Sequence, residues 1–142
     1  MRRREILKNI GTALLFASLS RIFAQAPTSK VKAAGGPYSD LSPAQFKGRL
    51  EAPGSHLLVN THIPYEGEIE GTDLFVPFNR VAEDLGLFPG DKSTEILVYC
   101  RSGQMSIIAA EVLGKAGYTH IKNLQGGMIA WREAGYSLRT VR

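Results

Sequence analysis

The segment Glu95–Cys100, EILVYC, constrains the fold of this chain more than any other stretch. It is an apolar run that ends at the only cysteine, and the short loop Arg101–Gly103 separates it from a helical pattern. Within Ser106–Ala116, apolar residues lie three and four positions apart, which is typical of an amphipathic helix. The segment therefore predicts a buried strand that leads through a tight loop into a helix.

The same alternation continues on both sides of this unit, and Ser42 and Pro43 are suited to begin the first helix. The expected strands are His56–Asn60, Asp73–Phe78 (cut short by Pro77), Glu95–Cys100 and His120–Leu124, and the expected helices are Ala44–Leu50, Asn79–Leu85, Ser106–Ala116 and Met128–Ala134. We predict an α/β fold with a central, mostly parallel sheet and helices on both faces.

The first 26 residues have a different layout. A basic stretch, Met1–Lys8, precedes an apolar stretch, Ile10–Leu19, that is too short to span a bilayer comfortably. This layout is typical of an export signal, and Arg3–Lys8 resembles a twin-arginine signal. We expect residues 1–26 to direct export to the periplasm, residues 27–37 to form a linker and residues 38–142 to form one domain. The alternative is a leader that stays attached as a membrane anchor.

The formal net charge of +4 belongs to this leader. Residues 1–26 hold five basic residues and one acidic residue, so 12 basic and 12 acidic residues remain in the rest of the chain. A domain without net charge lacks the basic surface expected of a nucleic-acid-binding protein. We therefore predict no nucleic-acid partner, and membrane contact only through the leader.

Cys100 lies at the carboxyl end of its expected strand, where parallel α/β sheets place their sites. Ser102 and Gly103 allow the loop to turn successive backbone N–H groups toward one point, with Ser106 as the expected N-cap of the next helix. Such a nest binds anions and favours a thiolate, and Arg101 adds positive charge. We predict that Cys100 is a nucleophile; the alternative is a small buried residue at a strand end.

Other uses of a single cysteine have less support. The chain has no second cysteine, and His56, His62 and His120 lack the spacing of metal ligands, so we predict no metal site and no cofactor. A cysteine phosphatase would need an arginine six residues after Cys100, where this chain has Ser106.

Two motifs resemble those of the rhodanese family of single-domain sulfurtransferases. Cys100–Ser106, CRSGQMS, is similar to the family's active-site loop C-x-x-G-x-R-[ST], and Gly126–Tyr136 is similar to its G-G-x-x-x-W-x-x-A-G motif. The resemblance implies a rhodanese-like fold with Cys100 as the catalytic residue. It also implies a substrate-binding loop made of Arg101, Ser102, Gly103, Gln104, Met105 and Ser106.

The chain also departs from the family pattern. Met105 replaces the arginine that closes the anion site in thiosulfate-using members, and Asn60 and His62 replace the family's aspartate and arginine. One fewer cation predicts weaker binding of the thiosulfate sulfonate, with Arg101 or the loop amides as alternative sources of anion affinity.

The resemblance implies a sulfurtransferase that moves a sulfane sulfur from thiosulfate or a persulfide to a thiophilic acceptor through a Cys100 persulfide. The expected partners are small sulfur donors and thiol acceptors, and a protein sulfur acceptor is also considered. The alternative is a non-catalytic rhodanese-like domain that carries persulfide or docks partners, which the absence of arginine at position 105 favours.

Overall fold

The computed structural model describes residues 37–140. The expected export signal at residues 1–26 and nearly all of the expected linker at residues 27–37 lie outside the described residues, so both remain predictions. Within residues 37–140, no helix is long and apolar enough to span a membrane.

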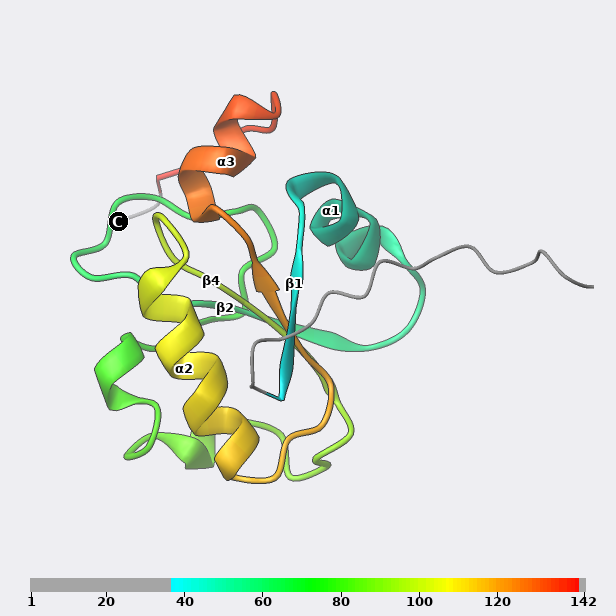
Figure 1. The fold of residues 1–142 in the computed structure, drawn as a ribbon, viewed down its shortest axis with the longest axis vertical. Coiled ribbons are helices and arrows are strands. Elements are labelled where there is room, and N and C mark those ends of the chain that lie inside the picture. Colours follow the sequence, from blue (N-terminus) through cyan, green and yellow to red (C-terminus); the bar gives the residue numbers. More distant parts are fainter. Residues whose placement is uncertain (1–36, 141–142) are drawn as a thin grey trace, which may run out of the picture. The chain divides into compact units, whose positions relative to one another are not determined.

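A five-stranded sheet forms the centre of the described part, in the order β1-β5-β4-β2-β3 (Figure 1). All its pairings are parallel, so the expected parallel sheet is confirmed. The strands are β1 (Tyr38–Leu41), β2 (His56–Asn60), β3 (Leu74–Phe75), β4 (Glu95–Tyr99) and β5 (Ile121–Leu124). β1 was not predicted, because YSDL lacks an apolar run and becomes a strand only by pairing with β5.

Three α-helices accompany the sheet: α1 (Pro43–Glu51), α2 (Gln104–Lys115) and α3 (Gly127–Glu133). The expected start of α1 is confirmed. The Ser42 side chain accepts from the backbone N–H of Gln45, and the Gln45 side chain accepts from the backbone N–H of Ser42, while Pro43 occupies the first helical turn.

The helix expected at Asn79–Leu85 is wrong. The structure has two short 3₁₀ segments instead, η2 (Phe78–Arg80) and η3 (Leu85–Leu87). Their hydrogen bonds span three residues, as from the Arg80 N–H to the Pro77 carbonyl and from the Phe88 N–H to the Leu85 carbonyl. Each segment is too short to cover the cost of nucleating an α-helix.

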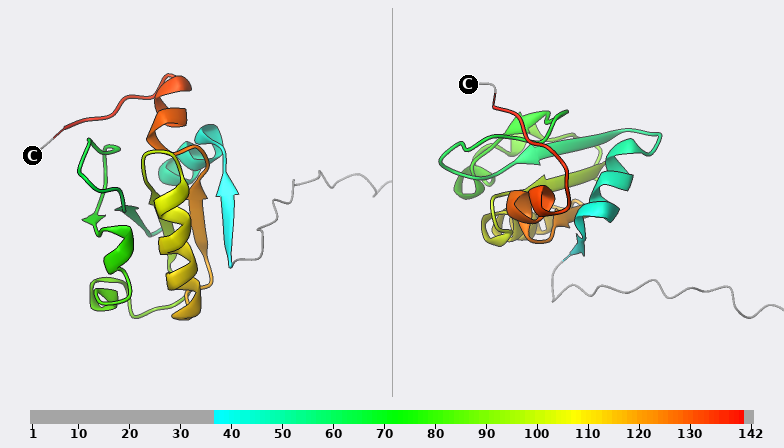
Figure 2. Two further views of the ribbon diagram at one scale, coloured as in Figure 1. Left: turned by 60° about the vertical axis from the view of Figure 1, so that its left-hand side comes forward. Right: turned by 90° about the horizontal axis from the view of Figure 1, so that it is seen from above.

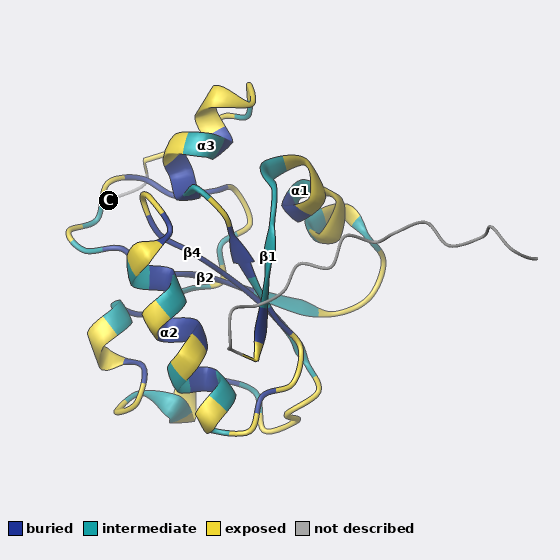
Figure 3. Cartoon of the chain, viewed as in Figure 1, coloured by how far each residue is buried: buried dark blue, intermediate teal, exposed yellow. Residues whose placement is uncertain are grey.

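Alternate residues of β4 face two separate hydrophobic clusters. Ile96 and Val98 pack in a cluster that contains Ala109 and Leu113 of α2. Leu97 and Tyr99 pack in a second cluster, which contains Phe46 of α1 and Met128 and Trp131 of α3. Figures 1 and 2 show α2 and α1 on opposite sides of the strands, and Figure 3 shows that β4 is buried along most of its length. The expected coverage of both sheet faces is thus confirmed.

The buried face of α2 differs in one position from the predicted one. Ile108 was expected to share a face with Ile107, Val112 and Leu113, but it is 45% exposed. Ala109 and Ala110 are buried in its place. Small side chains let the helix lie close to the sheet, so the contact face rotates toward the alanines.

Tyr99, the last residue of β4, ties the sheet to the loop that follows β2. Its hydroxyl accepts from the Ile69 N–H at 3.0 Å and lies 2.7 Å from Thr72 Oγ1. Thr72 Oγ1 donates to the Ile69 carbonyl, so the Tyr99 hydroxyl donates to Thr72. Burial of the ring is the main cause that raises the pKa of Tyr99 to about 12.

We expect Tyr99→Phe to lower the free energy of unfolding by about 1–3 kcal/mol, because the buried Ile69 N–H loses its acceptor. Urea denaturation measures the change. Tyr136→Phe is the control, since the Tyr136 hydroxyl has no hydrogen bond within residues 37–140.

The pKa of Tyr99 is raised from 10.0 to about 12 on folding. Its contribution to stability is therefore complete below pH 10 and is lost as the pH rises toward 12. A parent–variant difference that does not shrink over this range would contradict the assignment.

Candidate active site

Cys100 follows β4 directly and lies at the carboxyl end of the central strand. It is a free thiol with 1% of its surface exposed. The backbone N–H of Gly103 donates to its Sγ at an N···S distance of 2.9 Å. Gly103 adopts a positive φ of 106°, which turns this N–H back toward the sulfur and favours glycine over other residues.

Ser106 was expected to cap α2, and that prediction is wrong. The helix begins at Gln104 with Gly103 in the N-cap position, because the left-handed conformation of Gly103 starts the helix two residues early. Ser106 consequently lies inside the first turn and is fully buried. Its Oγ lies 3.4 Å from Cys100 Sγ, and its predicted role in binding substrate stays a prediction.

A buried hydrogen-bond chain orients the Ser106 hydroxyl. Ser106 Oγ donates to Asn123 Oδ1 at 2.6 Å, and Asn123 Nδ2 donates to Asp40 Oδ1 at 2.8 Å. A hydroxyl has one proton, and three acceptors lie within reach of Ser106 Oγ: Asn123 Oδ1 at 2.6 Å, the Gly103 carbonyl at 3.3 Å and Cys100 Sγ at 3.4 Å. Asn123 and Asp40 were not predicted as part of the site. The only available signal was the polar Asn123 near the end of the expected strand His120–Leu124.

The other side of the Cys100 loop is fixed by the start of α3. The N–H groups of Met128 and Ile129 donate to the carbonyls of Cys100 and Arg101, at 2.9 Å and 3.0 Å. Gly127 allows this close approach. A Cβ on Gly127 would lie 2.4 Å from the carbonyl carbon and oxygen of Arg101. The start of the Gly126–Tyr136 motif therefore holds the Cys100 loop in place through backbone hydrogen bonds.

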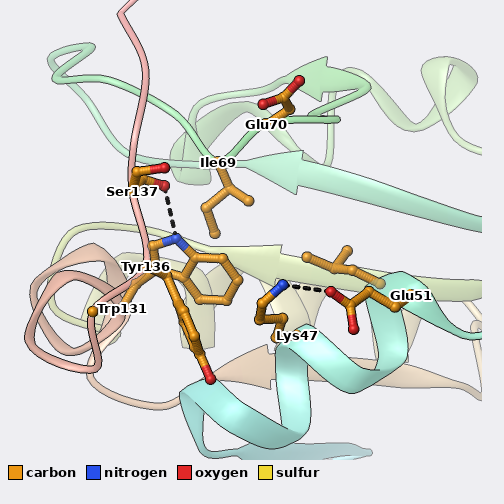
Figure 4. Close-up of a pocket in the computed structure, with 9 residues that line it drawn as sticks. Lys47, Glu51, Ile69, Glu70, Trp131, Tyr136 and Ser137 are labelled. Carbon is orange, nitrogen blue, oxygen red and sulfur yellow. Dashed lines mark hydrogen bonds and ion pairs between the residues drawn. The ribbon is translucent and has the colours of Figure 1, made fainter.

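Trp131 anchors α3 in the core and has no place in the loop itself. Its ring packs against Phe46 and Tyr136, with centroids 6.2 Å and 4.7 Å away, and its Nε1 donates to the Ser137 carbonyl at 3.0 Å. Trp131 also lines a cavity of about 490 Å³ beside α1, together with Lys47 and Ile69 (Figure 4). No residue of Cys100–Ser106 lines this cavity.

The exposed side chains of the loop carry one positive charge, that of Arg101. Its Nε lies 3.2 Å from Glu66 Oε1, and His62 Nε2 lies 3.3 Å from the same oxygen. Ser102 and Gln104 are exposed, and Met105 is half-buried. Of the six predicted substrate-binding residues, Gly103 and Ser106 contact Cys100 Sγ, whereas the Arg101 side chain contacts Glu66, which was not predicted.

The geometry provides a sulfur atom with a backbone N–H donor beside it and a helix start next to it. The first N–H groups of α2 have no acceptor within the helix, and the helix dipole adds positive potential at that end. The N–H donor and the helix start together make the surroundings of Cys100 Sγ favourable to an anion.

We expect Gly127→Ala to destabilise the protein more than Gly135→Ala, as measured by urea denaturation. Both glycines have positive φ, 61° and 94°, so backbone strain of about 1 kcal/mol is common to both variants. Only at Gly127 does the added Cβ meet backbone atoms, since Gly135 has open space around it. Overpacking adds about 1–3 kcal/mol at Gly127. Equal losses would show that the contact between α3 and the Cys100 loop is unimportant.

Comparisons with known proteins agree on one family. The family description "Rhodanese-like domain" matches residues 42–134. A sulfurtransferase of Allochromatium vinosum is 31% identical over 100 residues, which cover 68% of this chain and 91% of that protein. The thiosulfate sulfurtransferase PspE of Escherichia coli is 31% identical over 70 residues, which cover 48% of this chain and 67% of that protein.

Solved structures show the same fold. A rhodanese-like domain from an Anabaena protein matches with a TM-score of 0.62 and 25% identity, covering 74% of this chain and 80% of that one. A rhodanese-related protein from Thermoplasma volcanium matches with a TM-score of 0.60 and 24% identity, covering 70% of this chain and 95% of that one. The expected rhodanese-like fold is confirmed.

Proposed function

Because this chain belongs to the rhodanese-like domain family, we propose that it transfers sulfane sulfur through a persulfide formed on Cys100. The family and its sulfurtransferase relatives support sulfur transfer as the general activity. The observation that carries the specific proposal is the 2.9 Å contact between the Gly103 N–H and Cys100 Sγ at the start of α2. This contact favours a nucleophilic thiolate and then an anionic persulfide at the same point.

The reaction takes two displacement steps. The Cys100 thiolate attacks the outer sulfur of the donor, a new S–S bond forms, and the donor's S–S bond breaks. Its electron pair leaves with sulfite when the donor is thiosulfate. An acceptor thiolate then attacks the outer sulfur of the persulfide and forms a new S–S bond with it. The S–S bond of the Cys100 persulfide breaks, and its electron pair returns to Cys100 Sγ. The electrons balance over the two steps, so no external oxidant or reductant is needed.

Incubation of the protein with thiosulfate or with a small-molecule persulfide should add the mass of one sulfur atom to the intact chain. Cyanide, a thiophilic acceptor, should remove this mass again. Cys100→Ser should show neither change, because Cys100 is the only thiol. Mass spectrometry of the intact protein measures both steps. Loading of the Cys100→Ser variant would contradict the proposed persulfide.

A second candidate function is a persulfide carrier that does not turn over thiosulfate. Met105 in place of a cation, and the contact of Arg101 with Glu66, favour it, because both leave little free positive charge for a sulfonate. Loading by a persulfide donor but not by thiosulfate would select this function.

We expect Met105→Arg to raise kcat/KM for thiosulfate by about ten- to a hundredfold, the equivalent of a charge-assisted hydrogen bond of about 1.5–3 kcal/mol. The rate with an uncharged acceptor should change little. A steady-state assay of sulfite release measures the effect.

The matched control for this change is Leu87→Arg, which adds the same charge at an exposed position of η3, outside the Cys100 loop. An equal gain in both variants would mean that only the net charge of the protein matters. No gain from Met105→Arg, together with loss of thiosulfate activity in Arg101→Ala, would show that Arg101 already binds the anion.

A further inference from the structure

The β2–β3 loop places a carboxylate against the only basic side chain of the Cys100 loop. Glu66 Oε1 lies 3.2 Å from Arg101 Nε, and the two side chains are 44% and 57% exposed. Because Arg101 directly follows Cys100, its guanidinium is the loop's one side-chain cation available to an anion approaching the sulfur. In the structure that cation is directed to Glu66.

Glu66 is held in this position by its surroundings. The Asn60 side chain accepts from the His62 N–H at 3.0 Å and donates to the Gly67 carbonyl at 3.1 Å, which fixes the segment on both sides of Glu66. His62 adds a further contact, with Nε2 at 3.3 Å from Glu66 Oε1. The His62 side chain is only 9% exposed, and neither ring nitrogen forms a hydrogen bond within the described residues. The carboxylate therefore lies between a buried imidazole and an exposed guanidinium.

We propose that Glu66 is a specificity-determining residue that withholds Arg101 from anionic sulfur donors. This inference rests on the proposed function of Cys100 and specifies its substrate class. Met105 is apolar and the charge of Arg101 is paired with Glu66. A dianionic donor such as thiosulfate therefore meets the backbone amides of the loop but no free cation. Glu66 acts through Arg101 and is a positioning residue.

The inference is tested by the reactivity of Cys100 toward two alkylating agents of similar size. Iodoacetate is an anion and iodoacetamide is neutral, so the ratio of their rates reports the electrostatic potential at the sulfur. Because Cys100 is the only cysteine, the alkylated mass of the intact protein measures that site alone. Glu66→Gln should raise the iodoacetate-to-iodoacetamide ratio by about three- to fivefold, the effect expected when an exposed ion pair is released.

The matched control is Glu70→Gln, which removes the same charge from the same loop. Glu70 is exposed and makes no ion pair with Arg101. The ratio should change less in Glu70→Gln than in Glu66→Gln. An equal rise in both variants would mean that only the charge of the loop matters and would overturn the inference.

A double-mutant cycle separates an effect through Arg101 from a direct effect of Glu66. In the Arg101→Ala background, Glu66→Gln should leave the ratio unchanged, because no guanidinium remains to be released. A rise of the same size in that background, or no rise in the parent background, would overturn the inference.

Loading with thiosulfate, measured on the same variants, keeps this inference distinct from the proposed function. Loading of Glu66→Gln should exceed that of the parent by a similar factor. If no variant is loaded by any sulfur donor but the alkylation ratios follow the cycle, the proposed sulfur transfer fails and the control of Arg101 by Glu66 stands. If loading occurs but the ratios do not follow the cycle, sulfur transfer stands and the role of Glu66 fails.

Discussion

Two backbone hydrogen bonds from α3 hold the loop that carries Cys100. They pair the carbonyls of Cys100 and Arg101 with N–H groups of α3, and buried carbonyls need such partners. The contact is possible only because Gly127 has no Cβ. α3 is itself held in the core by Trp131, so the loop, the helix and one hydrophobic cluster behave as one unit.

Two hydrogen-bond donors lie beside the sulfur. The Gly103 N–H donates to Sγ at 2.9 Å, and the Ser106 hydroxyl, which also donates to Asn123 Oδ1, lies 3.4 Å from Sγ. Asp40 accepts from the Asn123 amide, and Asn123 in turn orients the Ser106 hydroxyl. Such fully paired buried networks are rigid, since an unpaired member would be costly.

The exposed charges outside this buried centre leave little free positive charge beside it. Arg101 contacts Glu66, and position 105 is a methionine. Under the proposed function, the backbone of the loop, held by Gly103 and Gly127, supplies the donors to the sulfur, and the exposed charges of Arg101 and Glu66 would set the choice of sulfur donor.

The sequence by itself determined the parallel α/β architecture, the strand–loop–helix unit around Cys100 and the start of α1, because apolar periodicity and capping residues act over short distances. The short strand β1 was missed, since its residues Tyr38–Leu41 form a strand only beside β5. The role of Ser106 was also misassigned, because Gly103 begins the helix earlier. Only the tertiary structure joined Ser106 to Asn123 and Arg101 to Glu66. These pairs are 17 and 35 positions apart, and no local pattern encodes which side chains meet when parallel strands bring their carboxyl ends together.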